Sequence, residues 1–249
     1  MANKMNNYFS SVFTIEQLNN VPQLGQYEGN MVDTFNFSTE EVQEKLQDLN
    51  TGPDMSHPRI LRTLADKLPR PLANIFNNSV KTVIVPENWK SANVTAIYKK
   101  GRREEPGNYG PISLTSLVSK TMERLVNGRL ITYLETNNQI GDSQHGFRNK
   151  RSWLTSLLDL FSQVIDTHDT NNNKAIDLGY LDFQKTFDKV PHERLMLEVN
   201  AHGIQGDAAR WIRNWLAGRR QRVCINQSNS IWCTTRWCIR PTIISYLYK

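Results

Sequence analysis

Apolar residues recur at helical spacing along much of this 249-residue chain and predict most of its regular structure. Ser38-Thr39-Glu40-Glu41 has the pattern of a capping box, and apolar residues follow it at helical intervals up to Leu49. Thr51-Gly52-Pro53-Asp54 then ends this helix. The same periodicity predicts further helices over residues 58–68, 71–83, 116–135, 152–168, 192–201 and 207–216.

Strands are predicted over residues 93–98, which are rich in Val, Ile and Thr, over the apolar run 175–181, and over residues 219–226. Residues 99–107 are charged and contain Gly and Pro, which is typical of a loop. Trp211 and Trp215 lie one helical turn apart, so we expect both in the core, with the arginines around them exposed. The chain therefore mixes α and β structure, with helices in the majority.

The composition limits the class of protein but leaves its partner open. The apolar fraction is 39% and the charged fraction is 22%, as in ordinary soluble globular proteins. A net charge of +6 fits a nucleic-acid partner about as well as it fits none. The three cysteines form no CxxC pair, which favours a reducing compartment. Without a long apolar run or a signal peptide, we expect an intracellular protein of the nucleus or cytoplasm, neither secreted nor membrane-spanning.

The segment from Tyr180 to Val190 holds the most specific candidate chemistry. Asp182 directly follows the strand predicted over 175–181, and Phe187 and Asp188 come shortly after it. A carboxylate on a rigid strand end can ligate Mg²⁺ through oxygen, and two such ions can clamp a phosphoryl transfer. An Asp that caps the next turn would give the same local pattern, so this segment alone leaves both interpretations open.

This segment is one of five sequence blocks that occur in a fixed order along the chain. Together they resemble the reverse transcriptase of non-LTR, LINE-type retrotransposons, particularly the jockey-like and chicken-repeat-like groups. The similarity covers nearly the whole chain up to about Thr235. The blocks are PENWKSANVTAIYKKG (86–101), PGNYGPISLTSLVSKTMERL (106–125), DSQHGFRNKRS (142–152), the Asp182 segment, and AHGIQGDAARWIRNWLAGRRQRVCIN (201–226).

This resemblance implies an α+β fold with the fingers and a partial palm of a right-hand polymerase. Residues 1–85 would form a helical N-terminal extension that precedes the polymerase core, and residues 86–235 would form the fingers and partial palm. Residues 236–249 depart from the family, and we interpret them as a frameshift-like tail. RNA template and DNA primer would be the partners, and Mg²⁺ would be the cofactor.

The resemblance also assigns roles to individual residues. Asp182 matches the first catalytic aspartate, which binds the metal ions together with the backbone carbonyl of Phe183. Phe187 matches the aromatic under the incoming sugar, although core packing would also explain this side chain. The other assignments are basic, polar or aromatic residues that face the triphosphate (Lys99, Lys100 and Arg103) or the template (Gln144, Phe147, Arg148 and Arg151).

One basic segment and one histidine have simpler explanations, and one residue departs from the family. Residues 99–103 would also suit a solvated surface, which is what most charge runs are. His145 has no metal partner in sequence, so we expect it to form hydrogen bonds. Gly110 stands where the family has an arginine that faces the nucleotide, which puts nucleotide handling in doubt.

The resemblance ends before the family's second acidic motif, A-D-D, and its thumb. We therefore expect a truncated, retrotransposon-derived RNA-directed DNA polymerase fragment that is inactive alone and binds nucleic acid weakly and non-specifically. Three other interpretations stay open. They are a working polymerase that takes the missing carboxylates from another chain, a non-catalytic nucleic-acid-binding module, and a functionless remnant of a decayed element.

Overall fold

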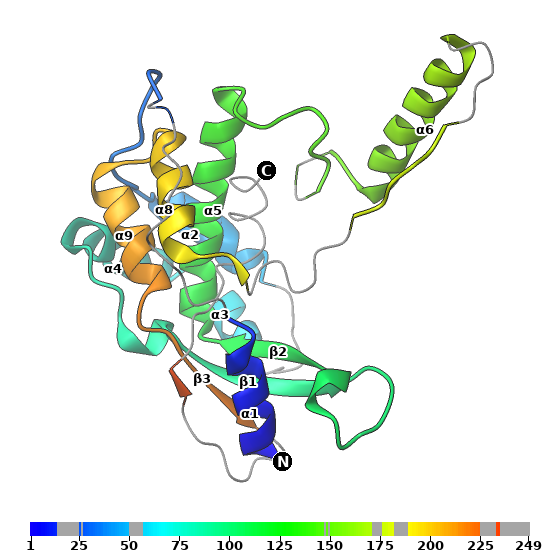
Figure 1. The fold of residues 1–249 in the computed structure, drawn as a ribbon. Coiled ribbons are helices and arrows are strands. Elements are labelled where there is room, and N and C mark those ends of the chain that lie inside the picture. Colours follow the sequence, from blue (N-terminus) through cyan, green and yellow to red (C-terminus); the bar gives the residue numbers. More distant parts are fainter. Residues whose placement is uncertain are drawn as a thin grey trace.

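A computed structural model describes residues 1–13, 25, 27–49, 57–146, 148, 150–170, 176–181, 189–224 and 233–234. A small sheet forms one end of the body, and helices pack beyond it (Figure 1). The strand order is β2-β1-β3-β4. Strand β1 (Ser91–Tyr98) runs antiparallel to β2 (Tyr109–Thr115) and parallel to β3 (Arg220–Cys224), which pairs with the short β4 (Cys233–Thr234). The fold is therefore α+β, as expected.

Most of the predicted helices are confirmed within one or two residues. The capping box is present at the start of the first predicted helix, where Ser38 Oγ accepts from Glu41 N and Glu41 Oε2 accepts from Ser38 N. The confirmed helices are α2 (Thr39–Gln47), α4 (Pro69–Thr82), α5 (Leu117–Thr136), α6 (Trp153–Thr170), α8 (His192–Ala201) and α9 (Gly206–Leu216).

The helix predicted over 58–68 is shorter than expected. Helix α3 covers His57–Thr63, and the chain then passes through turns to α4. In these turns Ala65 N donates to Arg62 O and Lys67 N donates to Leu64 O, which is the tighter i−3 pattern. The tightening lets the backbone change direction before Pro69, where α4 begins.

The sequence patterns missed some elements, among them one helix and one strand. Helix α1 (Ala2–Ser11) has no side-chain N-cap, so its start gives no local signal. Strand β2 contains Gly110 and Pro111, which normally argue against a strand. Pro111 is tolerated because β2 is the edge of the sheet and pairs only with β1.

The predicted strand over 175–181 is wrong for its described part. Residues 176–181 have no regular secondary structure, and Tyr180 and Leu181 are 79% and 88% exposed. A strand needs a neighbour to pair its backbone groups, and the described sheet does not include this segment.

The main hydrophobic core lies among the helices of the body. It contains buried residues from both sides of the boundary predicted after residue 85, between the N-terminal extension and the polymerase core. The boundary itself stays a prediction. At its centre, Trp211 stacks on Trp215 with ring centroids 4.9 Å apart, and Trp89 meets Trp215 edge-on at 6.4 Å. Both tryptophans of α9 are therefore in the core, as expected.

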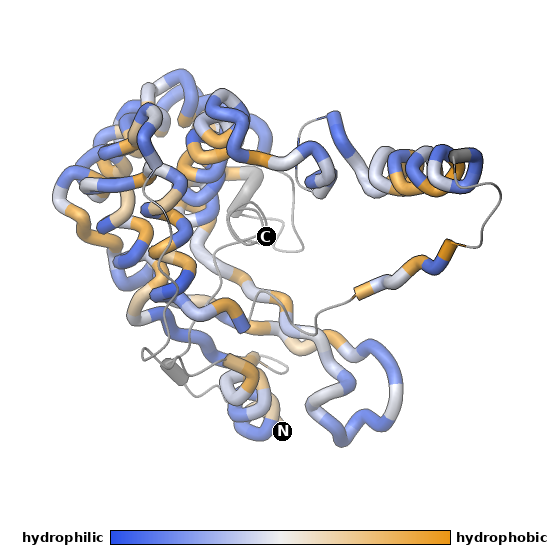
Figure 2. The backbone as a smooth tube through the Cα atoms, turned by 45° about the horizontal axis from the view of Figure 1, so that its top comes forward, coloured by the Kyte–Doolittle hydropathy of each residue, from blue (hydrophilic) through white to orange (hydrophobic). Residues whose placement is uncertain are grey.

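A smaller cluster holds α1 against the sheet. Met5 and Phe9 of α1 are buried against Val94 of β1 and Val223 of β3. Helix α6, in contrast, projects away from the body in both views (Figures 1 and 2). Among the described residues, no helix has both the length and the apolar character needed to cross a bilayer.

Candidate nucleic-acid interface

The basic loop between β1 and β2 is a closed, ordered turn. Strand pairing continues to Tyr98 and Tyr109, and Lys99 N then donates to Asn108 O at 2.8 Å. Asn108 Nδ2 donates to Arg102 O at 2.8 Å, and Tyr109 Oη donates to Arg103 O at 2.9 Å. Gly101 has a φ of +90°, and a Cβ there would lie 2.5 Å from Asn108 Nδ2, so this turn requires glycine.

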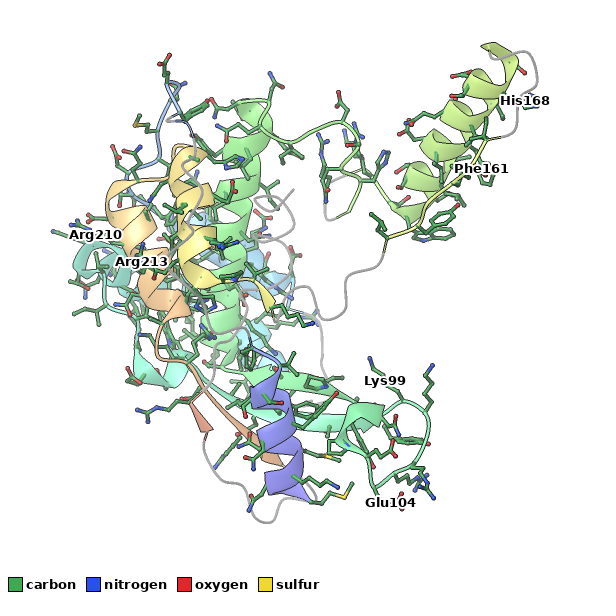
Figure 3. All side chains as sticks on the ribbon, viewed as in Figure 1. Lys99, Glu104, Phe161, His168, Arg210 and Arg213 are labelled. Carbon is green, nitrogen blue, oxygen red and sulfur yellow. The ribbon has the colours of Figure 1, made fainter. Side chains whose placement is uncertain are left out.

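This loop presents four cations to solvent, and it is held from two sides. Lys99, Lys100, Arg102 and Arg103 are all exposed, and none forms an ion pair with a described carboxylate. The Arg103 guanidinium lies 5.3 Å from the centroid of the Tyr98 ring. From α1, Lys4 Nζ donates to Glu104 O at 3.3 Å; Figure 3 shows Lys99 and Glu104 on this loop.

Gly110 and Lys99 are adjacent across the base of the loop. A Cβ at Gly110 would lie 2.6 Å from Lys99 Cε and 3.3 Å from Lys99 Nζ. The Lys99 side chain therefore occupies the space that a side chain at position 110 would need. This contact could not be predicted from the sequence, because it depends on the register that places Gly110 opposite Ile97.

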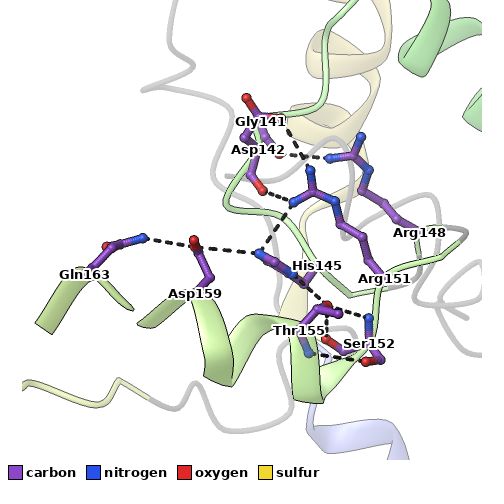
Figure 4. Close-up of polar contacts among 9 residues, drawn as sticks. All are labelled: Gly141, Asp142, His145, Arg148, Arg151, Ser152, Thr155, Asp159 and Gln163. Atoms are coloured by element: carbon purple, nitrogen blue, oxygen red, sulfur yellow. Dashed lines mark hydrogen bonds and ion pairs between the residues drawn. The ribbon is translucent and has the colours of Figure 1, made fainter. Parts of the chain in front are cut away.

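Three of the four predicted template residues, Gln144, Arg148 and Arg151, lie in the loop between α5 and α6, and Figure 4 shows the two arginines. Arg148 Nη1 donates to Gly141 O at 3.3 Å, and Arg148 Nε lies 3.5 Å from Glu135 Oε1. Arg151 donates to the Asp142 carbonyl, and its Nη2 lies 3.5 Å from Asp142 Oδ1. Gln144 Nε2 donates to Gly146 O at 3.3 Å. These polar groups thus hold their own loop together.

His145 connects this loop to α6. His145 Nδ1 lies 2.9 Å from Thr155 Oγ1, so the expected hydrogen-bonding role is confirmed. Its Nε2 lies 3.7 Å from Asp159 Oδ2 and 3.5 Å from Arg151 Nη1. The block therefore fixes the first turns of α6 to the loop.

Four predicted site residues lie outside the described residues: Asp182, Phe183, Phe187 and Phe147. Their roles stay predictions. Among the residues that the structure does describe, no three His, Cys, Asp or Glu side chains come close enough to hold a metal ion. The described residues alone therefore do not form the expected Mg²⁺ site.

Arg219 corrects the expectation of exposed arginines around α9, because its side chain is buried. Its Nη1 donates to Trp215 O at 2.9 Å, and its Cζ lies 5.0 Å from the Trp215 ring centroid. Burial lowers the pKa of this guanidinium to about 10, and the Glu123 carboxylate partly opposes that shift. Arg213 is half-exposed but forms an ion pair with Glu193, and Arg222 Nε donates to Asn93 Oδ1 at 2.6 Å.

Comparison with known proteins identifies the class of this fold. Residues 97–238 match the family model described as "Reverse transcriptase (RNA-dependent DNA polymerase)". The match begins within β1, includes the basic loop and the network in Figure 4, and covers more than half of the chain. The chain therefore belongs to the reverse transcriptase family.

Individual relatives narrow this assignment. The chain is 29% identical over 203 residues to the probable RNA-directed DNA polymerase from transposon BS of Drosophila melanogaster. It is 33% identical over 150 residues to the RNA-directed DNA polymerase from mobile element jockey of the same organism. These matches cover 77% and 59% of this chain but only 21% and 16% of the relatives. The chain is thus a non-LTR, LINE-type reverse transcriptase sequence that spans about a fifth of the length of such relatives.

Proposed function

We propose that this chain forms the fingers and a partial palm of a retrotransposon RNA-directed DNA polymerase, with the β1–β2 loop as its triphosphate-binding element. The observation that carries the proposal is the closed basic loop within the family match. Its backbone is fixed by Asn108 and Tyr109, while its four cations stay exposed. A fixed group of cations can neutralise phosphate charge without first reorganising.

Lys99 supports this role further. Its ammonium lies over Gly110, where the family pattern has an arginine. A cation therefore remains beside position 110 although that position has no side chain. We propose that Lys99, Lys100 and Arg103 face the triphosphate, and that the lysine over Gly110 supplies the charge that the family draws from arginine.

The template would contact the loop between α5 and α6. We propose Gln144, Phe147, Arg148 and Arg151 for this contact. Because Arg148 and Arg151 already donate to Gly141 O and Asp142 O, template binding here would use the remaining donors of each guanidinium. The contact would then be non-specific and directed at phosphates, which makes the binding weak and sensitive to salt.

Catalysis would depend on Asp182, with Phe187 under the sugar. Mg²⁺, held by Asp182 and the Phe183 carbonyl, would neutralise charge on the reacting phosphates when bound. The 249 residues supply only this one carboxylate of the family's metal-binding set. We therefore propose that the 249-residue polypeptide by itself does not extend a primer.

Fluorescence anisotropy with an RNA–DNA hybrid tests the loop. We expect the affinity of the wild type to fall steeply between low and high salt. The Lys99→Ala/Arg103→Ala variant should bind several-fold more weakly and show a shallower salt dependence. The matched control is Lys67→Ala/Arg70→Ala, which removes one exposed cation just before α4 and one in its first turn. Equal losses in the two variants would contradict a localised interface.

Primer extension on an RNA template with Mg²⁺ or Mn²⁺ tests catalysis. We expect no product above background from this polypeptide. Extension that disappears in Asp182→Ala would show a working site and would overturn the proposed inactivity. Binding without extension fits both a polymerase part and a non-catalytic binding module. Extension restored by fusing the family's A-D-D hairpin and thumb to this chain would select the polymerase part.

A further inference from the structure

Helix α6 exposes a large apolar face that no other described element covers. Trp153 is 79% exposed, Leu158 59%, Phe161 55% and Ile165 57%, with Leu154 and Leu157 also on the surface. Figure 3 shows the helix, with Phe161 and His168 labelled, standing clear of the body. Figure 2 shows apolar segments recurring along it between polar ones.

The spacing of these residues fits a helical partner. Leu154, Leu158, Phe161 and Ile165 are separated by four, three and four residues, which is the repeat of a helix–helix seam. In an antiparallel pair, residues whose numbers have a constant sum face each other. Leu154 then pairs with Ile165 and Leu158 pairs with Phe161 of a second copy, so both seam contacts are formed in a single register.

The size of the face also fits a second copy. Six large side chains at these exposures present on the order of 600 Å² per copy. Monomeric proteins rarely expose a contiguous apolar patch above about 300–600 Å². Complete burial of two such faces would remove about 1,200 Å² from solvent, the lower end of the range for a specific interface.

Charge decides the orientation. Helix α6 contains Asp159, Asp166 and Asp169 and has no Lys or Arg, whereas Lys150 and Arg151 precede it. A parallel pair would bring the aspartates of the two copies together. An antiparallel pair brings the exposed Lys150, just before the start of α6 in one copy, toward the end of the other α6 that holds Asp169, whose side chain is 73% exposed.

We propose that two copies of this chain associate through α6 as an antiparallel, two-fold symmetric helix pair with its axis between Leu158 and Phe161. The contact is isologous, so each copy supplies the same face. The proposal goes beyond polymerase function and does not rest on it, because neither the basic loop nor Asp182 takes part.

Sedimentation equilibrium of the whole chain over a concentration series tests the association. We expect a monomer–dimer equilibrium, and Leu158→Asp should raise the dimer dissociation constant by more than about tenfold. The matched control is Ile84→Asp, which changes an apolar residue that is 63% exposed elsewhere on the body. Circular dichroism of both variants checks that each stays folded. A monomeric wild type, a larger aggregate, or a dimer unaffected by Leu158→Asp would overturn the proposal.

Charge exchange tests the orientation. Lys150→Asp and Asp169→Lys should each weaken the dimer a few-fold, and the double variant should restore it. Failure of the double variant to recover would rule out the antiparallel orientation. The wild type could instead stay monomeric while α6 binds an added polypeptide that contains the rest of the polymerase. That result would show that the polymerase, and not a second copy of this chain, covers the apolar face, and it would overturn the proposal.

Discussion

Two sets of tryptophans in this chain have opposite environments. Trp211 and Trp215 of α9 are 1% and 2% exposed, whereas Trp153 of α6 is 79% exposed. Both helices carry apolar residues at helical spacing. The difference lies in the partners: α4 and α8 meet α9, while no described element covers the apolar face of α6. An apolar face therefore indicates that a partner is required, without fixing whether the same chain supplies it.

The largest expected effect comes from truncating a buried tryptophan. Trp211→Ala should lower the free energy of unfolding by about 3–5 kcal/mol, because it leaves a cavity and removes the hydrogen bond that Trp211 Nε1 donates to Ser79 Oγ. Trp153→Ala should change it by less than about 0.5 kcal/mol. Urea denaturation followed by circular dichroism measures both. Similar losses would mean that α6 is part of the cooperative core.

Truncating a buried arginine should also cost more stability than truncating a more exposed one, although the difference should be smaller than for the tryptophans. Arg219→Ala should cost about 2–4 kcal/mol, because the carbonyl of Trp215 loses its buried, charged donor. Arg151→Ala, beside α6, should cost less than about 1 kcal/mol because the Asp142 carboxylate of its ion pair is almost fully exposed to solvent. The midpoints of urea unfolding at pH 7 compare the two variants. An equal cost would contradict the different burial of these guanidiniums.

The caps of α2 and α6 should differ in their effect on global stability by about 1 kcal/mol. Ser38→Ala removes the capping box of α2 and should lower global stability by about 1 kcal/mol. Ser152 and Thr155 exchange similar hydrogen bonds at the start of α6. Ser152→Ala should instead speed hydrogen exchange in α6 while global unfolding changes little. A full loss of global stability in Ser152→Ala would show that α6 unfolds together with the body.

The smallest effect concerns pH. Burial lowers the pKa of Lys90 below its ordinary value of 10.5, with an opposing contribution from Glu87. Between the folded-state pKa and 10.5, the unfolded chain binds more protons, so the contribution of Lys90 to stability rises with pH. The unfolding free energy of the wild type relative to Lys90→Met should therefore increase on alkaline titration. A decrease would mean that the folded state favours the charged amine.

Much of the helical structure could be predicted because its signals are local. The capping box at Ser38 and the apolar spacing of α5 and α9 do not depend on distant residues. Helix α1 was missed because it lacks a capping side chain, and β2 was missed because Pro111 conceals an edge strand. The strand expected before Asp182 was wrong over 176–181, since a strand exists only where its backbone finds a partner.

The family can be recognised from the sequence alone, because its blocks occur in a fixed order, and residues 97–238 match the reverse transcriptase model. Most helix positions also follow from local apolar spacing. Only the tertiary structure showed that Lys99 lies over Gly110, that Arg219 is buried, and that the arginines near His145 bind their own loop. The physical reason is distance along the chain. Helix periodicity and capping depend on neighbours within about four residues, whereas side-chain contacts and burial depend on which distant segments the fold brings together.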